Sequence, residues 1–149
     1  MKTDKLDKLL LSLPGWLFTV AVVLAVLYLT LFPDPVPEMD IELFPGVDKV
    51  VHAIMMLGVY LCISLDLMRH DHKAMHRLSL RTCALIFVIT SAFGGAIELI
   101  QAAMNMGRGC EITDFWADMA GAMAGWIIVK LTPWPYQRPD ANHRPANHG

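Results

Sequence analysis

The sequence predicts an all-α protein, a four-helix transmembrane bundle with both chain termini in the cytoplasm. Hydrophobic residues make up 55% of the 149 residues, and the mean hydropathy is +0.45. Four apolar segments are each about 17–22 residues long, which is the length of helix that crosses about 30 Å of hydrocarbon. In lipid the backbone must satisfy its own hydrogen bonds, so these segments are expected to be helices. The basic residues are distributed unevenly between the segments, and this sets the orientation.

The segments before, within and after the spans define the domain organisation. Residues 1–14 form a cytoplasmic lead, residues 15–131 a four-span membrane domain, and residues 132–149 a disordered, proline-rich cytoplasmic tail. The first span, 15–32, is interpreted as retained. Its apolar core is too long for a cleaved signal peptide, and no small-x-small cleavage site follows it. The other three spans are predicted at residues 50–68, 82–103 and 115–131.

Small residues mark the last two predicted spans at four-residue intervals. Ser91 and Gly95 lie on the third span, and Ala117, Gly121 and Gly125 on the fourth. Small residues at this spacing let helices approach closely in lipid. We therefore expect these faces to be packing faces.

The positive charges predict which side of the membrane each loop occupies. With a cytoplasmic N-terminus, all but two of the 12 Lys and Arg residues fall inside, and only Lys49 and Arg108 fall outside. Cytoplasmic loops of membrane proteins carry such an excess of basic residues. The sequence therefore predicts a multi-pass membrane protein with both termini on the cytoplasmic side.

Polar residues on three of the spans are expected to meet near the outer face. Counting about 1.5 Å per residue from the cytoplasmic ends places His52 and Glu98 near that face and Asp118 some turns below it. Ionisable groups inside a span are costly and usually face the bundle interior or a cavity. The predicted ligand-binding set pairs residues three or four positions apart, which share a helix face: Lys49 with His52, Glu98 with Gln101, Asp114 with Asp118, and Arg108 in the loop between the last two pairs.

Structural interpretations of these residues stay open. Lys49 can extend toward the interface from a helix start. Asp114 can offset the positive end of its helix. Glu98 and Asp118 lie within spans and need partners, and an ion-pair network with Lys49 and Arg108 that only braces the bundle would supply them.

These motifs together resemble the VanZ-like family over about residues 48–131. They are "DKVVHAIMMLG" (48–58), "ELIQ" (98–101), "RGCEITD" (108–114) and "DMAGAMAG" (118–125). In that family a Lys-x-x-His begins one span and a Glu-x-x-Gln ends the next. An Arg then precedes an Asp by six residues, and a glycine pair follows. The resemblance places the family's polar set on Lys49, His52, Glu98, Gln101, Arg108 and Asp114.

The chain departs from the family pattern at two positions. The family often has an aromatic residue one turn after the His, where this chain has Met56. It commonly has Asn four residues after the Asp, where this chain has Asp118, so the site gains a carboxylate.

The resemblance implies an integral membrane protein of the bacterial cell envelope, a multi-pass protein of the bacterial plasma (inner) membrane. The family is named after a protein associated with resistance to the glycopeptide teicoplanin. We expect Lys49 and Arg108 to hold an anionic group, because guanidinium and ammonium groups bind phosphate well. The expected partners are membrane lipids, with a lipid-linked cell-wall precursor or a glycopeptide as the ligand, and no nucleic acid.

A membrane-embedded enzyme acting on a lipid-linked phosphate is the alternative. Glu98 and His52 would then act as the acid–base pair, and a metal-assisted variant would add Asp114 and Asp118 as ligands. The chain has no motif typical of a hydrolase or transferase and no CxxC pair. The sequence by itself therefore indicates neither a cofactor nor a resident metal, and a structural role stays the third hypothesis.

Overall fold

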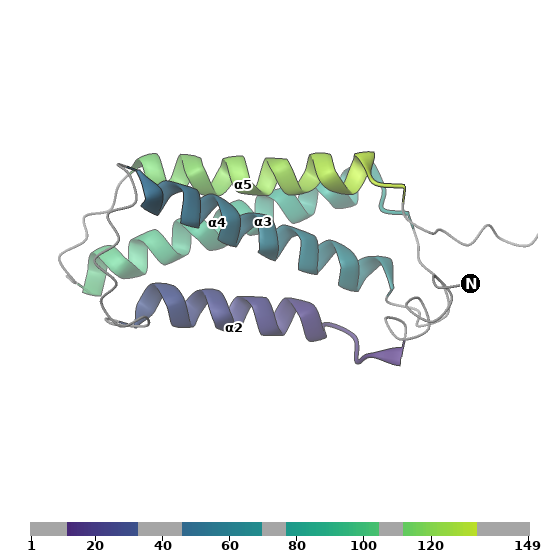
Figure 1. The fold of residues 1–149 in the computed structure, drawn as a ribbon, viewed down its shortest axis with the longest axis horizontal. Coiled ribbons are helices and arrows are strands. Elements are labelled where there is room, and N and C mark those ends of the chain that lie inside the picture. Colours follow the sequence, from purple (N-terminus) through teal and green to yellow (C-terminus); the bar gives the residue numbers. More distant parts are fainter. Residues whose placement is uncertain (1–11, 33–45, 70–76, 105–111, 134–149) are drawn as a thin grey trace, which may run out of the picture.

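The computed structural model describes residues 12–32, 46–69, 77–104 and 112–133, and within these ranges it contains helices and no strand. The helices, labelled as in Figure 1, are α2 (Leu17–Leu31), α3 (Val47–Met68), α4 (Leu80–Met104) and α5 (Ile112–Leu131). The predicted all-α class is confirmed. Arg108, most of the predicted lead and most of the predicted tail lie outside the described residues.

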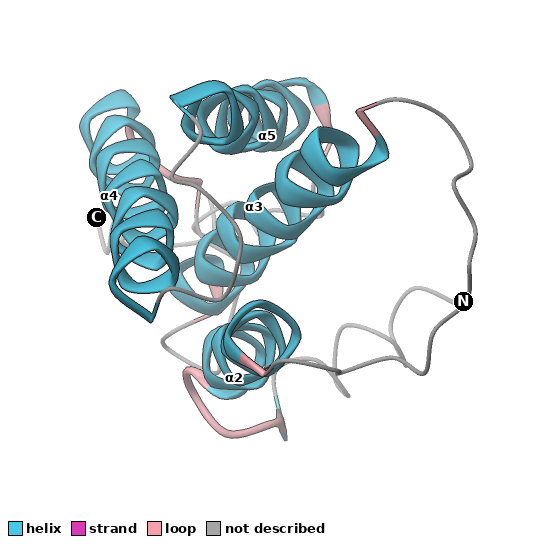
Figure 2. Ribbon diagram, turned by 90° about the vertical axis from the view of Figure 1, so that its left-hand side faces the viewer, coloured by secondary structure: helices cyan, strands magenta, loops and turns pink. Residues whose placement is uncertain are grey.

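Successive helices run in opposite directions, so the start of α2 and the end of α5 lie at the same end of the bundle (Figure 1). Helices α3 and α4 each contact the other three, and α3 makes the more extensive contacts, above all with α5. The end-on view in Figure 2 shows α3 between α5 on one side and α2 on the other. The starts of α3 and α5 and the end of α4 therefore share one end of the bundle.

Both α3 and α5 begin about one turn earlier than expected, at residues 47 and 112 instead of 50 and 115. The added turns contain charged residues, which hydropathy alone assigns to loops. Asp48 and Asp114 lie in these first turns, where a carboxylate is stabilised by the positive end of the helix dipole. Gly46 precedes α3 with φ of 89°, a left-handed conformation that glycine adopts without steric cost.

Two of the described helices, α3 and α4, are long and apolar enough to cross a membrane, with mean hydropathies of 2.0 and 2.1. Helix α2 is apolar but shorter, at 15 residues. Helix α5 carries Asp114, Asp118 and Lys130. The four-span topology and the cytoplasmic termini therefore stay predictions.

Glycines bring α3 and α5 into close contact. A Cβ at Gly121 would overlap the backbone carbonyl of Ala53, and one at Gly125 would overlap the side chain of Tyr60. The small-residue face expected on the last span is therefore a packing face at these two positions. The core next to it consists of Tyr60, Met68, Ile86, Ala122 and Val129.

At the end of the bundle where α3 ends and α2 begins, a buried ion pair connects these two helices. Arg69, which is fully buried, places Nη2 2.7 Å from Asp66 Oδ1 and donates to the carbonyls of Leu13 and Pro14 at 3.1 and 2.7 Å. Asp66 also accepts a hydrogen bond from the Thr19 backbone N–H in the first turn of α2, at 2.8 Å. This pair therefore fixes where α2 begins against the end of α3.

Candidate functional site

Three helices place ionisable side chains at one end of the bundle. Lys49 and His52 lie in the first two turns of α3, Glu98 lies near the end of α4, and Asp114 and Asp118 lie in the first two turns of α5. Because successive helices run in opposite directions, the starts of α3 and α5 and the end of α4 come together at the same end (Figure 1). The structure thus brings five of the seven predicted site residues into two adjoining groups.

The inner group, which we call the His–carboxylate cluster, consists of His52, Glu98 and Asp118. His52 Nδ1 lies 3.2 Å from Asp118 Oδ1 and 3.5 Å from Glu98 Oε1. All three residues are buried, with exposed fractions of 5%, 4% and 1%. Glu98 Oε1 has no hydrogen-bond donor among the described residues, because its approach to Nδ1 lacks hydrogen-bond geometry. One ring nitrogen therefore faces two carboxylates.

The outer group is an ion pair between α3 and α5. Lys49 Nζ lies 2.9 Å from Asp114 Oδ1. The Lys49 side chain is 38% exposed, whereas that of Asp114 is 8% exposed. Since Lys49 and Asp114 each lie about one turn nearer the helix ends than His52 and Asp118, this pair forms the accessible edge of the site.

Gln101 faces a different helix from Glu98. Its Nε2 donates to the backbone carbonyl of Thr30 on α2, at 2.9 Å. The Thr30 hydroxyl donates in turn to the carbonyl of Val26. Gln101 therefore links α4 to α2. Arg108, the remaining predicted residue, lies outside the described part of the chain.

Two residues that sequence reasoning did not select also belong to this end of the bundle. Asp48 is exposed, and its carboxylate, His52 and Asp114 have ligand atoms within 4.8 Å of one another. Gly94 on α4 lies against the carboxylate of Asp118. Asp48 precedes His52 by four residues and Gly94 precedes Glu98 by four, so the i,i+4 spacing was the available signal.

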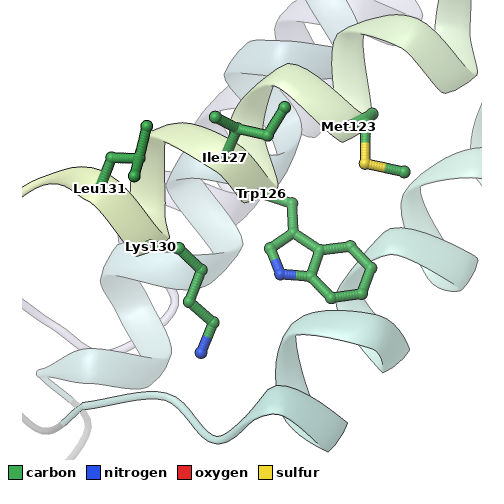
Figure 3. Close-up of a pocket in the computed structure, with 5 residues that line it drawn as sticks. All are labelled: Met123, Trp126, Ile127, Lys130 and Leu131. Carbon is green, nitrogen blue, oxygen red and sulfur yellow. The ribbon is translucent and has the colours of Figure 1, made fainter.

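An apolar groove near the other end of α5 is separate from this site. Its volume is about 350 Å³, and it is lined by Met123, Trp126, Ile127, Lys130 and Leu131. Figure 3 shows Trp126 and Lys130 projecting from the same side of α5. Lys130 Nζ donates to the carbonyl of Leu78 just before α4, at 3.0 Å. The described residues that line this groove include no carboxylate or imidazole, so they lack the chemistry of the polar site.

Residues 15–133 of the chain match the family described as VanZ/LLP1. This range includes all four described helices. No curated protein and no solved structure matches the chain.

Proposed function

The chain belongs to the VanZ/LLP1 family, and we propose that it is a bacterial cell-envelope protein that binds an anionic head group within the membrane. The ligand would be a lipid-linked cell-wall precursor or a glycopeptide with an acyl chain, as in a glycopeptide-resistance role. The observation that carries the proposal is the position of Lys49. Its partly exposed ammonium is held against a buried carboxylate at the edge of a polar cluster between apolar helices.

The ion pair with Asp114 orients Lys49 before any ligand arrives. An ammonium group has three donors, so Lys49 can keep its contact with Asp114 and still donate to a phosphate or carboxylate. Ligand binding at a preoriented group loses less side-chain entropy than binding at a mobile one. Arg108 precedes Asp114 by six residues in the sequence, and the proposal includes it as the second cation.

The test is a binding measurement on the purified chain in nanodiscs, with a polyprenyl phosphate, the matching neutral polyprenol and teicoplanin as separate probes. We expect the phosphate to bind and the alcohol not to bind. Lys49→Ala and Arg108→Ala should each weaken binding, while Arg81→Ala, an exposed cation at the start of α4, should not. Binding of teicoplanin alone would assign the ligand to the glycopeptide class. Unchanged affinity in both Lys49→Ala and Arg108→Ala would refute the proposal.

The contact between His52 and Glu98 favours a second candidate function. A buried imidazole 3.5 Å from a carboxylate can act as an acid–base pair, which would let the site cleave or transfer a lipid-linked phosphate. Mass spectrometry of membrane lipids should then show a product in cells with the wild-type chain that is missing with Glu98→Gln. Identical lipid profiles would exclude this candidate and leave binding or bracing.

A further inference from the structure

We propose that the His–carboxylate cluster of His52, Glu98 and Asp118 binds one divalent transition-metal cation, with Mn²⁺ or Zn²⁺ as the fitting ions. The three ligand atoms come from α3, α4 and α5 and lie within 4.8 Å of one another. A neutral imidazole nitrogen and carboxylate oxygens are common ligands of these ions. The inference goes beyond head-group binding, since it concerns the buried interior of the site and a different ligand.

The spacing of the ligand atoms fits a bound ion. Bonds from zinc to nitrogen and oxygen are about 2.0–2.2 Å long. Two ligands at that distance, at an angle between octahedral and tetrahedral, therefore lie about 3.0–3.5 Å apart. His52 Nδ1 is 3.2 Å from Asp118 Oδ1 and 3.5 Å from Glu98 Oε1. Both carboxylate oxygens thus lie from His52 Nδ1 at the separation expected of two ligands on one cation, and the ligand atoms of all three residues lie within 4.8 Å of one another.

Hydrogen bonds alone do not satisfy all three side chains of the His–carboxylate cluster. Nδ1 of His52 can carry one proton, and Asp118 takes the better-aligned contact. Glu98 Oε1 then remains buried without a hydrogen-bond donor among the described residues, which is an unfavourable state for a carboxylate. A cation between the three atoms would contact all of them at once.

The charge of the His–carboxylate cluster also favours a bound cation. Glu98 and Asp118 are two buried carboxylates beside an imidazole, and buried charges are normally paired or coordinate metals. Lys49, the cation nearest in chain position to His52, is paired with Asp114 at the outer edge. A divalent cation offsets two carboxylates while His52 stays neutral, the form in which imidazole coordinates a metal.

The types of ligand atom indicate which ions fit the cluster, and the contacts of the side chains indicate which of the two neighbouring groups is the better site. Mg²⁺ and Ca²⁺ prefer oxygen ligands alone, whereas a mixed imidazole and carboxylate set suits Mn²⁺ and Zn²⁺. The neighbouring group of Asp48, His52 and Asp114 is the weaker candidate, because Asp48 is exposed and Asp114 already pairs with Lys49. Three protein ligands also leave a coordination position open, which the anionic head group proposed above could occupy.

The test uses the full-length chain without an affinity tag, stripped with a chelator in detergent and titrated with Mn²⁺. The electron paramagnetic resonance signal of free Mn²⁺ reports binding, and Zn²⁺ is added as a competitor. We expect one saturable site per chain and a ¹⁴N modulation in pulsed spectra from His52. Glu98→Gln and Asp118→Asn should each weaken Mn²⁺ binding by more than about tenfold, since even groups outside the first ligand shell contribute about 10–100-fold.

Asp48→Asn is the matched control and should bind Mn²⁺ like the wild type. Circular dichroism and size-exclusion chromatography check that each variant folds. The ¹⁴N modulation is measured on the wild type, so it tests for a nitrogen ligand without any substitution. Absence of saturable binding by Mn²⁺ and Zn²⁺, or binding without a ¹⁴N modulation, would overturn the proposal. Binding lost in Asp48→Asn but kept in Glu98→Gln would overturn it as well. Since the metal alone is the probe, failure of the head-group proposal leaves this result unaffected.

Discussion

The carboxylate of Asp118 on α5 lies directly against the backbone of Gly94 on α4. A Cβ at position 94 would overlap Oδ2 and Cγ of Asp118. The missing side chain of Gly94 therefore leaves the space in which Asp118 points toward His52, 3.2 Å away. Helix packing and site geometry depend on the same glycine.

Replacing Gly94 with alanine should destabilise the protein by about 1–3 kcal/mol, the usual cost of forcing extra volume into a packed interior. Unfolding by denaturing detergent, followed by circular dichroism, measures the change. Gly58→Ala is the matched control, since its Cβ would lie 3.7 Å from Val22 Cγ2, an ordinary contact. Alanine also has the higher helix propensity, so the control should be neutral or stabilising. Equal stability of the two variants would contradict the steric argument.

The meeting of the polar groups at one end of the bundle could be predicted from the sequence. Helices rise about 1.5 Å per residue, so counting from the basic residues Arg69 and Arg81 placed His52 and Glu98 at similar depth. Antiparallel neighbours then bring these levels together, as the structure shows for His52 and Glu98. The depth of a residue in a helical span depends only on the number of residues between it and the end of the span, so this depth could be predicted from the sequence.

The pairing of these groups across helices could not be predicted in the same way. Glu98 and Gln101 are three residues apart and were expected to share a face, yet Glu98 approaches His52 on α3 while Gln101 reaches Thr30 on α2. Three residues turn a helix by about 300°, so the two side chains diverge by about 60°. In a bundle of closely spaced helices this divergence is enough to change the neighbour, and helix rotation is set by contacts such as Gly121 on Ala53.

The pair of Lys49 and Asp114 should show measurable coupling in a double-mutant cycle. Lys49→Met alone leaves the carboxylate of Asp114, 8% exposed, without this cation, so it should destabilise the protein more than the double variant Lys49→Met/Asp114→Asn does. The expected coupling is at the low end of about 0.5–3 kcal/mol, because Lys49 is partly solvated. Additive effects in the unfolding midpoints would show that the pair contributes nothing.

The same double variant separates bracing from ligand binding. If Lys49 and Asp114 only brace the bundle, the neutral pair should restore stability and keep binding of the polyprenyl phosphate. If Lys49 contacts the head group, stability should return while binding stays weak. Recovery of both properties together would argue against the proposed function.

Removing the carboxylate of Asp66 should loosen the start of α2. Asp66→Asn removes the carboxylate that lies 2.7 Å from the fully buried Arg69, and removing one partner of a buried pair costs about 3–5 kcal/mol. It also weakens the acceptor for the Thr19 N–H. Hydrogen exchange of the first turn of α2 should therefore become faster. Asp48→Asn, which removes an exposed carboxylate on the same helix, is the control and should leave that exchange unchanged.

The orientation predicted from the charges of the chain can be tested on α4. The end of α4 shares the Lys49 side of the bundle, and its start lies at the opposite end, so the positive-inside rule places Met104 outside and Leu80 inside. Both side chains are exposed. In a chain whose native cysteines are replaced by alanine, a membrane-impermeant maleimide added to intact cells should label Met104→Cys. It should label Leu80→Cys only after permeabilisation. The reverse pattern would invert the topology, and labelling of both from outside would show that α4 does not cross the membrane.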